Sequence, residues 1–436
     1  MTYLLSLYPK HVTIPLRRLL LLALLGLLAA CNRDTPPDPT PTPTPPPAGI
    51  VAAIGATVTP APTPSPTPVT GRVTLWHSWA AGEGDALVAA LTAYTERTPG
   101  VQVATLFVAP HELPAAYAEA ARNGGGPDLV LMSNWWLADL VAAGSALPLD
   151  DLLAPDAAGD YWPGAWASFQ LGDRLYGLPA HYSVPALYVN STLLNNAPSA
   201  PDTTALLEAA RNDPTQGIGL YANLYHVAWG FPAYGATFLD ADGRVILDQS
   251  AGASAFLTWL IALNETPGSY VSTDYGMLLD RFKKGEFAYF VDGPWALADL
   301  RTALGDALIV APLPAGPAGD ARPWLYSDGL LINPTVTPDQ QRLALDLARF
   351  VTGAESGQFL TAAGLLPAAR GATLDDPRLI GFARQAATAD AMPILPEMEH
   401  VWTYGGDMLV KALLGNTPPP AIIAETTALI NDANGK

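Results

Sequence analysis

The chain of 436 residues contains little cysteine and little charge, and each of these features excludes some kinds of site or partner. Its single cysteine, Cys31, excludes an internal disulfide and a metal site built from several cysteines. Only 14% of the residues are charged, and 22 Lys and Arg stand against 40 Asp and Glu. The formal net charge of −18 argues against nucleic acid and against anionic membrane surfaces as partners.

Several catalytic motifs are also absent from the sequence. It has no Gly-x-Ser-x-Gly nucleophile elbow, no P-loop and no His-Glu-x-x-His, and none of its six histidines are spaced four residues apart. We therefore expect no catalytic residue, no metal and no cofactor. A secreted glycoside hydrolase stays open as an alternative, because 40 acids leave room for the carboxylate pair that such an enzyme needs.

Long apolar runs occur only near the N-terminus. Lys10, Arg17 and Arg18 precede the apolar residues 19–30, which is typical of a signal peptide and is short for a membrane span. Small residues directly before Cys31 resemble the bacterial lipobox, which implies cleavage before Cys31 and a lipid on that residue. An ordinary signal peptide with an incidental cysteine, or a membrane span, are the alternatives.

Residues 31–69 contain two blocks rich in proline and threonine, which favour extended chain and cannot build a core. We interpret them as a lipid anchor followed by a spacer. The sequence leaves open whether this spacer is glycosylated, and it indicates no role for the apolar run 48–58.

Strands and helices alternate in the remainder of the chain. Apolar runs at 72–76, 101–107 and 128–132 predict strands, and helical patterns separate them. Such alternation predicts a parallel sheet in an α/β fold, with the loops after the strands at one edge of the sheet. Further along, we expect one helix over 224–234 and a strand over 244–247.

The segment 281–300 predicts the end of a helix, a strand, a turn and the start of another helix. The apolar run 287–291 has the length of a buried strand, and Asp292, Gly293 and Pro294 end it. Trp295 then lies beyond the carboxyl end of that strand, where ligands bind in open α/β sheets. The alternative is that Trp295 packs in the core.

Six spaced motifs resemble those of one family, the extracellular solute-binding proteins of bacterial ABC importers, and specifically the sugar-binding family that includes maltose-binding protein. They are 73–79 with its Trp-His-Ser-Trp, 126–130 with Gly-Pro-Asp, 175–179 followed by 186–190, 282–295 with Lys-Gly-Glu and Gly-Pro-Trp, 328–333 with 364–368, and 392–402. The resemblance covers about residues 72–432.

The resemblance implies two discontinuous α/β lobes, joined by crossing hinge strands, with the ligand in the cleft between them. This is the two-lobed periplasmic-binding-protein fold. The expected parts are residues 1–30 as signal peptide, 31–69 as anchor and linker, 70–181 with 312–368 as lobe I, and 182–311 with 369–436 as lobe II.

The resemblance also implies part of the ligand site. Trp295 and Trp402 stand where maltose-binding protein stacks tryptophan on sugar rings, whereas Met132 stands where it has a tryptophan of the first lobe. Its charged partners for sugar hydroxyls are mostly replaced: residues 79–81 are Trp-Ala-Ala in place of an Asp and a Lys, and Ser183 replaces a glutamate. A sugar is therefore implied, but maltodextrin in particular is not.

Flat aromatic rings cover the C–H faces of sugars, and short polar groups bind the hydroxyls. Of the neighbours Trp135 and Trp136, one must point inward, and we favour Trp135 as the exposed one. The expected platforms are Trp79, Trp135, Trp295 and Trp402. The expected hydrogen-bonding groups are His77, Asn134, His181, Tyr182, Tyr225, His226 and Asp328.

Alternatives remain for three of these groups and for one further tryptophan. His181 and His226 could equally be structural histidines, and Asp328 could equally cap a helix or a turn. Trp229 is expected in the core.

Together these features predict a substrate-binding component of an ABC importer. It would bind a sugar, an oligosaccharide by preference, close about its hinge and deliver the sugar to permease subunits. We expect a monomer on the outer side of the membrane, held there by its lipid alone. A carbohydrate-active enzyme and a cell-surface carbohydrate sensor or adhesion module are the alternatives, and the identity, length and linkage of the sugar stay open.

Overall fold

A computed structural model describes residues 70–194 and 199–436, and the predicted signal peptide, Cys31 and the linker lie outside them. Two sheets organise these residues. The first runs in the order β13-β6-β12-β3-β1-β2, with β14 beside β12. Its strands are β1 (Gly71–His77), β2 (Val101–Phe107), β3 (Leu129–Ser133), β6 (Gly177–Ser183), β12 (Trp324–Ile332), β13 (Leu366–Pro367) and β14 (Asp390–Ala391).

The second sheet runs in the order β11-β7-β10-β8-β9. Its strands are β7 (Ala186–Asn190), β8 (Ile218–Tyr221), β9 (Tyr270–Ser272), β10 (Tyr289–Asp292) and β11 (Leu308–Ala311), and a small hairpin joins β4 (Gln170–Leu171) to β5 (Arg174–Leu175). Strands β1, β2 and β3 pair in parallel, as do β8, β9 and β10. The predicted α/β class with parallel strands is therefore confirmed.

Helices connect the strands and cover the sheets. We call the first sheet with the helices beside it the first lobe, and the second sheet with its helices the second lobe. The helices of the first lobe are α1 (Ala81–Arg97), α2 (Leu113–Arg122), α3 (Leu137–Ala142), α4 (Pro163–Ala167), α11 (Pro338–Thr352) and α12 (Gly357–Ala362). Those of the second are α5 (Thr203–Asn212), α6 (Leu224–Val227), α7 (Gly230–Ala233), α8 (Ala251–Asn264), α9 (Tyr275–Lys283), α10 (Leu297–Leu304), α13 (Pro377–Ala386), α14 (Met398–Leu414) and α15 (Pro419–Ala433). None of the helices in the described ranges is long and apolar enough to cross a membrane.

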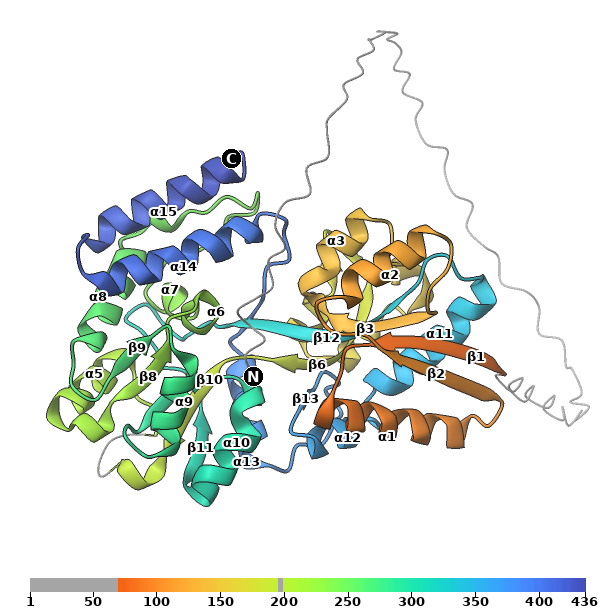
Figure 1. Cartoon of the computed structure of the whole chain (residues 1–436), viewed down its shortest axis with the longest axis horizontal. Coiled ribbons are helices and arrows are strands. Elements are labelled where there is room, and N and C mark those ends of the chain that lie inside the picture. The colour runs from red at the N-terminus through yellow and green to blue at the C-terminus, as the bar shows by residue number, and fades with distance from the viewer. Residues whose placement is uncertain (1–69, 195–198) are drawn as a thin grey trace, which may run out of the picture. The chain divides into compact units, whose positions relative to one another are not determined.

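The chain passes between the two sheets more than once. Strand β6 of the first sheet is followed directly by β7 of the second, and β11 of the second is followed by β12 of the first. Strands β6 and β12 lie side by side and antiparallel (Figure 1), with a register shift between Asp328 and Gly329. These two paired strands thus form a two-stranded link beside the points where the chain changes sheet.

Two predictions from the sequence are wrong in detail. The single helix expected over 224–234 is two short helices, because Pro232 has no N–H to donate to Ala228 and its ring crowds the preceding turn. The strand expected over 244–247 is reduced to a single antiparallel bridge between Val245 and Leu239, flanked by a hydrogen bond from the Ile246 N–H to the Phe238 carbonyl. On its other edge, Val245 exchanges both of its own backbone hydrogen bonds with the side chain of Asn431 on α15, so no strand pairs there.

Candidate functional site

Six aromatic rings from both lobes meet in a cluster that we call the aromatic cleft. Its members are Trp135, Tyr225, His226, Trp295, Tyr326 and Trp402. The indoles of Trp135 and Trp402 lie parallel, with centroids 5.8 Å apart and planes 3° apart. Trp135 follows β3 of the first lobe and Trp402 lies on α14 of the second, so this stack joins the two lobes.

A short helical turn after β3 positions Trp135. The turn, η1 (Asn134–Trp136), begins at Ser133, whose hydroxyl accepts a hydrogen bond from the Trp135 backbone N–H at 3.5 Å. The side chains of Trp135 and Trp136 then point in different directions: Trp135 is 40% exposed, and Trp136 is partly buried and packs against a hydrophobic core. The prediction that Trp135 is the exposed member of the pair is confirmed.

The turn after β10 positions Trp295 in the same cleft. The turn, η7 (Pro294–Ala296), begins after Gly293, and the Trp295 ring folds back over it. A Cβ on Gly293 would lie 2.2 Å from that ring, so only glycine allows this approach. Trp295 is half-buried and packs against both hydrophobic cores, and its ring lies 6.1 Å from that of Tyr225. Its position is therefore intermediate between the two expectations.

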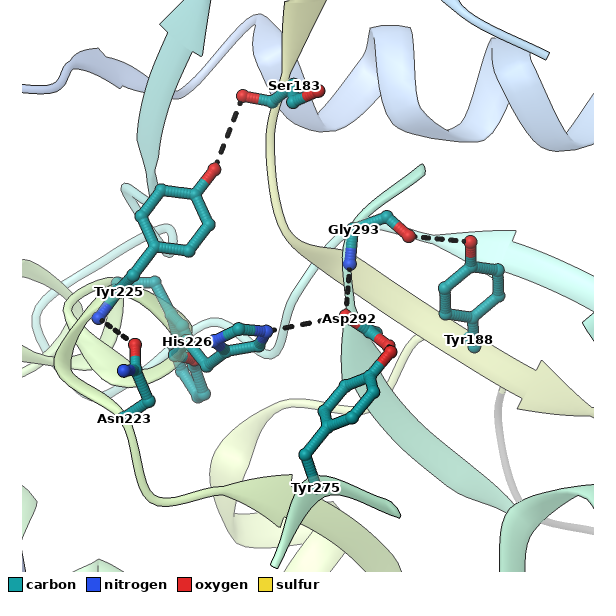
Figure 2. Close-up of polar contacts among 9 residues, drawn as sticks. Ser183, Tyr188, Asn223, Tyr225, His226, Tyr275, Asp292 and Gly293 are labelled. Atoms are coloured by element: carbon teal, nitrogen blue, oxygen red, sulfur yellow. Dashed lines mark hydrogen bonds and ion pairs between the residues drawn. The ribbon is translucent and has the colours of Figure 1, made fainter. Parts of the chain in front are cut away.

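A buried carboxylate lies beneath these rings. Asp292 is the last residue of β10 and is completely buried. It accepts hydrogen bonds from the Tyr275 hydroxyl at 2.8 Å and from the Gly293 backbone N–H at 2.8 Å, and His226 Nε2 lies 3.3 Å away. Figure 2 shows Tyr275 and His226 pointing at this carboxylate from different sides. Burial, followed by the charge of Asp292, raises the pKa of Tyr275, so the hydroxyl keeps its proton and donates.

Tyr225 links the cleft to the strand connection. Its hydroxyl donates to the Ser183 carbonyl, at the end of β6, over 3.4 Å (Figure 2). Burial raises the pKa of Tyr225 well above its usual value, so this hydroxyl also stays protonated. The sequence prediction named Tyr225 and His226 as polar groups of the site, and both lie within the aromatic cleft.

Other predicted site residues form a separate, buried cluster behind the cleft. Trp79 is 2% exposed and donates its Nε1–H to Asp328 at 2.7 Å. His181 Nε2 lies 3.6 Å from the same carboxylate oxygen. Trp79 therefore has no ring face open to a ligand in this structure, because its ring is packed in the core. Asp328 caps neither a helix nor a turn, since it lies within β12.

The charges of this cluster stabilise one another. Burial alone lowers the pKa of His181, but the nearby Asp328 carboxylate outweighs it and raises that pKa overall. Burial alone raises the pKa of Asp328, and His181 and Trp79 together bring it below its usual value. Glu83, on the first turn of α1, has its pKa raised by burial. His181 and Asp328 thus have a structural ion pair, and their predicted contact with ligand stays a prediction.

The remaining predicted residues make none of the ring contacts of the aromatic cleft. Asn134 is completely buried, and its Oδ1 accepts from the Ser327 backbone N–H at 3.0 Å, which ties η1 to β12. His77 packs edge-on against Phe107, and burial lowers its pKa. Tyr182 is 1% exposed and packs in a hydrophobic core. Trp229, expected in the core, is completely buried there.

Sequence reasoning missed Asp292, Tyr275 and Tyr326. It took Asp292 only as part of a turn, although an acid at the carboxyl end of a buried strand, directly before a candidate ligand-binding tryptophan, was visible in the sequence. Nothing local to Tyr275 or Tyr326 indicated a role, because their contacts to Asp292 and Tyr225 are made across the fold.

Two cavities lie away from the aromatic cleft. The larger, about 350 Å³, lies between the beginnings of α8 and α15, and the smaller, about 170 Å³, lies beside Leu313 and Gln385. No ring of the aromatic cleft lines either of them. In residues 70–194 and 199–436, no group of three His, Cys, Asp or Glu side chains is arranged to hold a metal ion.

Comparison with protein families gives one match that covers more than half of the chain. The family described as bacterial extracellular solute-binding protein matches residues 89–386. The match includes β10, Trp295 and most of both sheets, and it ends before Trp402.

Solved structures share the fold over most of the chain. A cyclo/maltodextrin-binding protein complexed with maltotetraose is 22% identical over 85% of this chain and 98% of its own, with a TM-score of 0.75. The GacH receptor of Streptomyces glaucescens, solved unliganded and with acarbose, is 22% identical over 84% and 98%, with a TM-score of 0.69. A Thermus thermophilus maltotriose-binding protein is 25% identical over 83% and 100%, with a TM-score of 0.66.

Proposed function

Because the chain belongs to the bacterial extracellular solute-binding proteins, we propose that its substrate is a sugar bound in the aromatic cleft. The family implies an exported protein with a substrate-binding role. The lobes we propose are residues 70–181 with 312–368, and 182–311 with 369–436. The paired strands β6 and β12 would act as the hinge, and the sugar would stabilise the closed form by touching both lobes at once.

One observation carries this proposal: tryptophans from the two lobes present parallel rings to one another. Indole faces cover the C–H patches of a sugar ring, and Trp295 and Tyr225 extend the apolar surface beside them. Polar groups for hydroxyls are close, since Tyr326 and His226 lie in the same cluster. The solved proteins of the same fold that bind maltotetraose, acarbose and maltotriose support a sugar of more than one ring.

A binding experiment tests the proposal directly. The purified full-length chain would be titrated with α- and β-linked oligosaccharides in a calorimeter, and the sugar recovered afterwards. We expect saturable binding and intact sugar, because the family is one of binding proteins. Cleavage products would instead favour a glycoside hydrolase, and the absence of binding to any oligosaccharide would overturn the assignment.

Export and anchoring complete the proposed role. We propose that residues 1–30 are removed, that Cys31 carries the lipid, and that residues 31–69 hold the binding lobes away from the membrane. The closed, loaded protein would deliver its sugar to permease subunits of an ABC importer, as a monomer. Labelled lipid precursor should be incorporated into the chain but not into a Cys31→Ala variant.

A further inference from the structure

The two stacked tryptophans each have an acid one helical turn away. Asp139 follows Trp135 by four residues on the continuous η1–α3 segment, and Glu399 precedes Trp402 by three residues on α14. Residues at these spacings share a helix face. Because the indoles stack across the two lobes, these spacings put the two acids on helix faces that border the stack. Partial burial, and then the charge of Glu399, raises the pKa of Asp139.

A third carboxylate lies on the inner side of the cleft, where Asp292 is buried under Trp295 and His226. Throughout the described ranges, neither Lys nor Arg forms an ion pair with Asp292, Asp139 or Glu399, whereas acids elsewhere, such as Glu355 and Glu425, do have such partners. The carboxylates of the cleft therefore have no positive side chain of the chain itself to balance them.

The sequence around the cleft shows why these acids have no positively charged partner. No Lys or Arg occurs in any of the segments that carry the six rings and their neighbours. These segments are residues 133–139, 221–229, 292–299, 326–328 and 392–405. A negatively charged ligand would find no cation here and would lose its water next to three acids.

His226 adds an acceptor atom among the rings. Its Nε2 faces Asp292, and its Nδ1 is buried without a hydrogen-bond partner. When the neutral ring donates from Nε2 to the carboxylate, Nδ1 is an acceptor. The rings of Tyr221, Tyr225 and Trp295 lie 5.0 to 5.8 Å from this imidazole, so the free acceptor belongs to the aromatic cleft.

We propose that the cleft selects a sugar bearing a protonated amine over the matching neutral sugar, and that it rejects sugars bearing carboxylates. An ammonium group can lie over the indole faces and donate charge-assisted hydrogen bonds to Asp139 and Glu399, which a hydroxyl does only more weakly. The inference rests on the proposed sugar-binding function and adds the charge class of the ligand to it.

The test compares sugars that differ only in charge. Trisaccharides of glucose, of 2-amino-2-deoxyglucose and of glucuronic acid, in both α-1,4 and β-1,4 linkage, are titrated into the purified full-length chain by calorimetry. The pH is about 6, below the pKa of the amine. In the linkage that binds, we expect the amine to bind about tenfold more tightly than glucose and the carboxylate to bind more weakly than either. Added salt should reduce the difference.

Two variants locate the effect in the protein. The double variant Asp139→Asn with Glu399→Gln should lower the ratio of amine to neutral affinity to near one. Glu208→Gln removes an exposed acid from α5, outside the cleft segments, and should leave the ratio as it is. Folding of each is checked by thermal unfolding.

The outcomes separate the two proposals. Equal binding of the amine and neutral sugars, tighter binding of the neutral sugar, or a ratio that survives the double variant would overturn the charge preference and leave sugar binding standing. Absence of binding to every sugar in both linkages would overturn sugar binding itself.

Discussion

At the scale of single residues, the aromatic cleft shows how one position serves both packing and recognition. Trp295 touches both hydrophobic cores, yet it is only half-buried and faces the rings of Tyr225 and His226. Its position depends on Gly293, which leaves room for the indole, and on the Tyr188 hydroxyl, which donates to the Gly293 carbonyl at 2.9 Å. The ring is thus held in place before any ligand arrives, which limits the entropy lost on binding.

Truncation of this ring should therefore weaken binding. We expect Trp295→Ala to lower the affinity for the sugar by about 2 kcal/mol, by analogy with aromatic anchors at interfaces. Calorimetric titration measures it. The matched control is Trp166→Ala, which removes a half-buried indole that packs on Tyr161 outside the cleft. Equal affinities for the Trp295 variant and the unmodified chain, with intact folding, would show that Trp295 is a core residue only.

A second residue-scale prediction concerns the buried carboxylate. Tyr275→Phe removes the 2.8 Å hydrogen bond to Asp292 and leaves part of a buried charge unsatisfied. The free energy of unfolding should fall by about 1 to 3 kcal/mol, measured by chemical denaturation. Tyr221→Phe is the control, because its ring packs on Tyr275 at 5.5 Å without a hydrogen bond to Asp292. Equal losses in the two variants would contradict the assigned role of the Tyr275 hydroxyl.

At the scale of elements, local pattern predicted strands well where the strand is buried and continuous. The run 128–132 became β3 and the run 287–291 became most of β10, because apolar residues of that length have few alternatives to a buried strand. The run 244–247 formed only one bridge, from Val245 to Leu239, and the side chain of Asn431, far away in sequence, binds the other edge of Val245. No pattern within 244–247 indicates that partner.

The residues of the candidate site were likewise predicted only in part from the sequence. The sequence correctly predicted that Trp135, Trp295 and Trp402 lie close together, because they are carried by turns after strands and by a helix face. It did not show that Trp79 and His181 lie in a different cluster. Whether a ring after a strand is open or buried depends on what packs over it, and here the carboxylate that engages both residues comes from Asp328 on β12.

The paired strands β6 and β12 carry a pH-dependent ion pair. A histidine whose pKa is raised in the folded state stabilises fully below pH 6.5 and loses that contribution as the pH rises through its raised pKa. Half-buried Glu83 adds a loss of the same sign from about pH 4.5 upward, and Asp328 acts in the opposite direction, below about pH 3.8. Stability should therefore fall as the pH rises above 6.5.

His181→Gln tests this element directly. The unmodified chain should lose stability above pH 6.5 with a slope of at most about 1.4 kcal/mol per pH unit, and the variant should show a flatter profile there. Urea denaturation at closely spaced pH values measures both curves. Parallel profiles in the two proteins would exclude His181 as the titrating group.

At the scale of the whole molecule, side-chain contacts between the lobes add to the strand connection. Trp135 of the first lobe stacks on Trp402 of the second and also lies 6.5 Å from Tyr225. Aromatic pairs contribute about 0.5 to 1.5 kcal/mol beyond the area they bury. In a two-state hinge, a difference of 1.4 kcal/mol changes the ratio of open to closed forms about tenfold. In the proposed hinge closure, the stack would favour the form in which the two lobes meet, even without ligand.

Removing the stack should shift the free protein towards the open form. Dyes placed at Val88→Cys on α1 and Leu414→Cys on α14, both highly exposed, report the distance between the lobes by energy transfer in a chain that also carries Cys31→Ser. We expect Trp135→Ala with Trp402→Ala to change the transfer efficiency of the free protein, because the closed form loses its inter-lobe stack while the hinge strands stay paired. Saturating sugar should then produce a larger change in the labelled parent than in this variant, whose ligand platforms are gone. An identical efficiency for parent and variant without sugar would show that the stack does not set the balance between open and closed lobes.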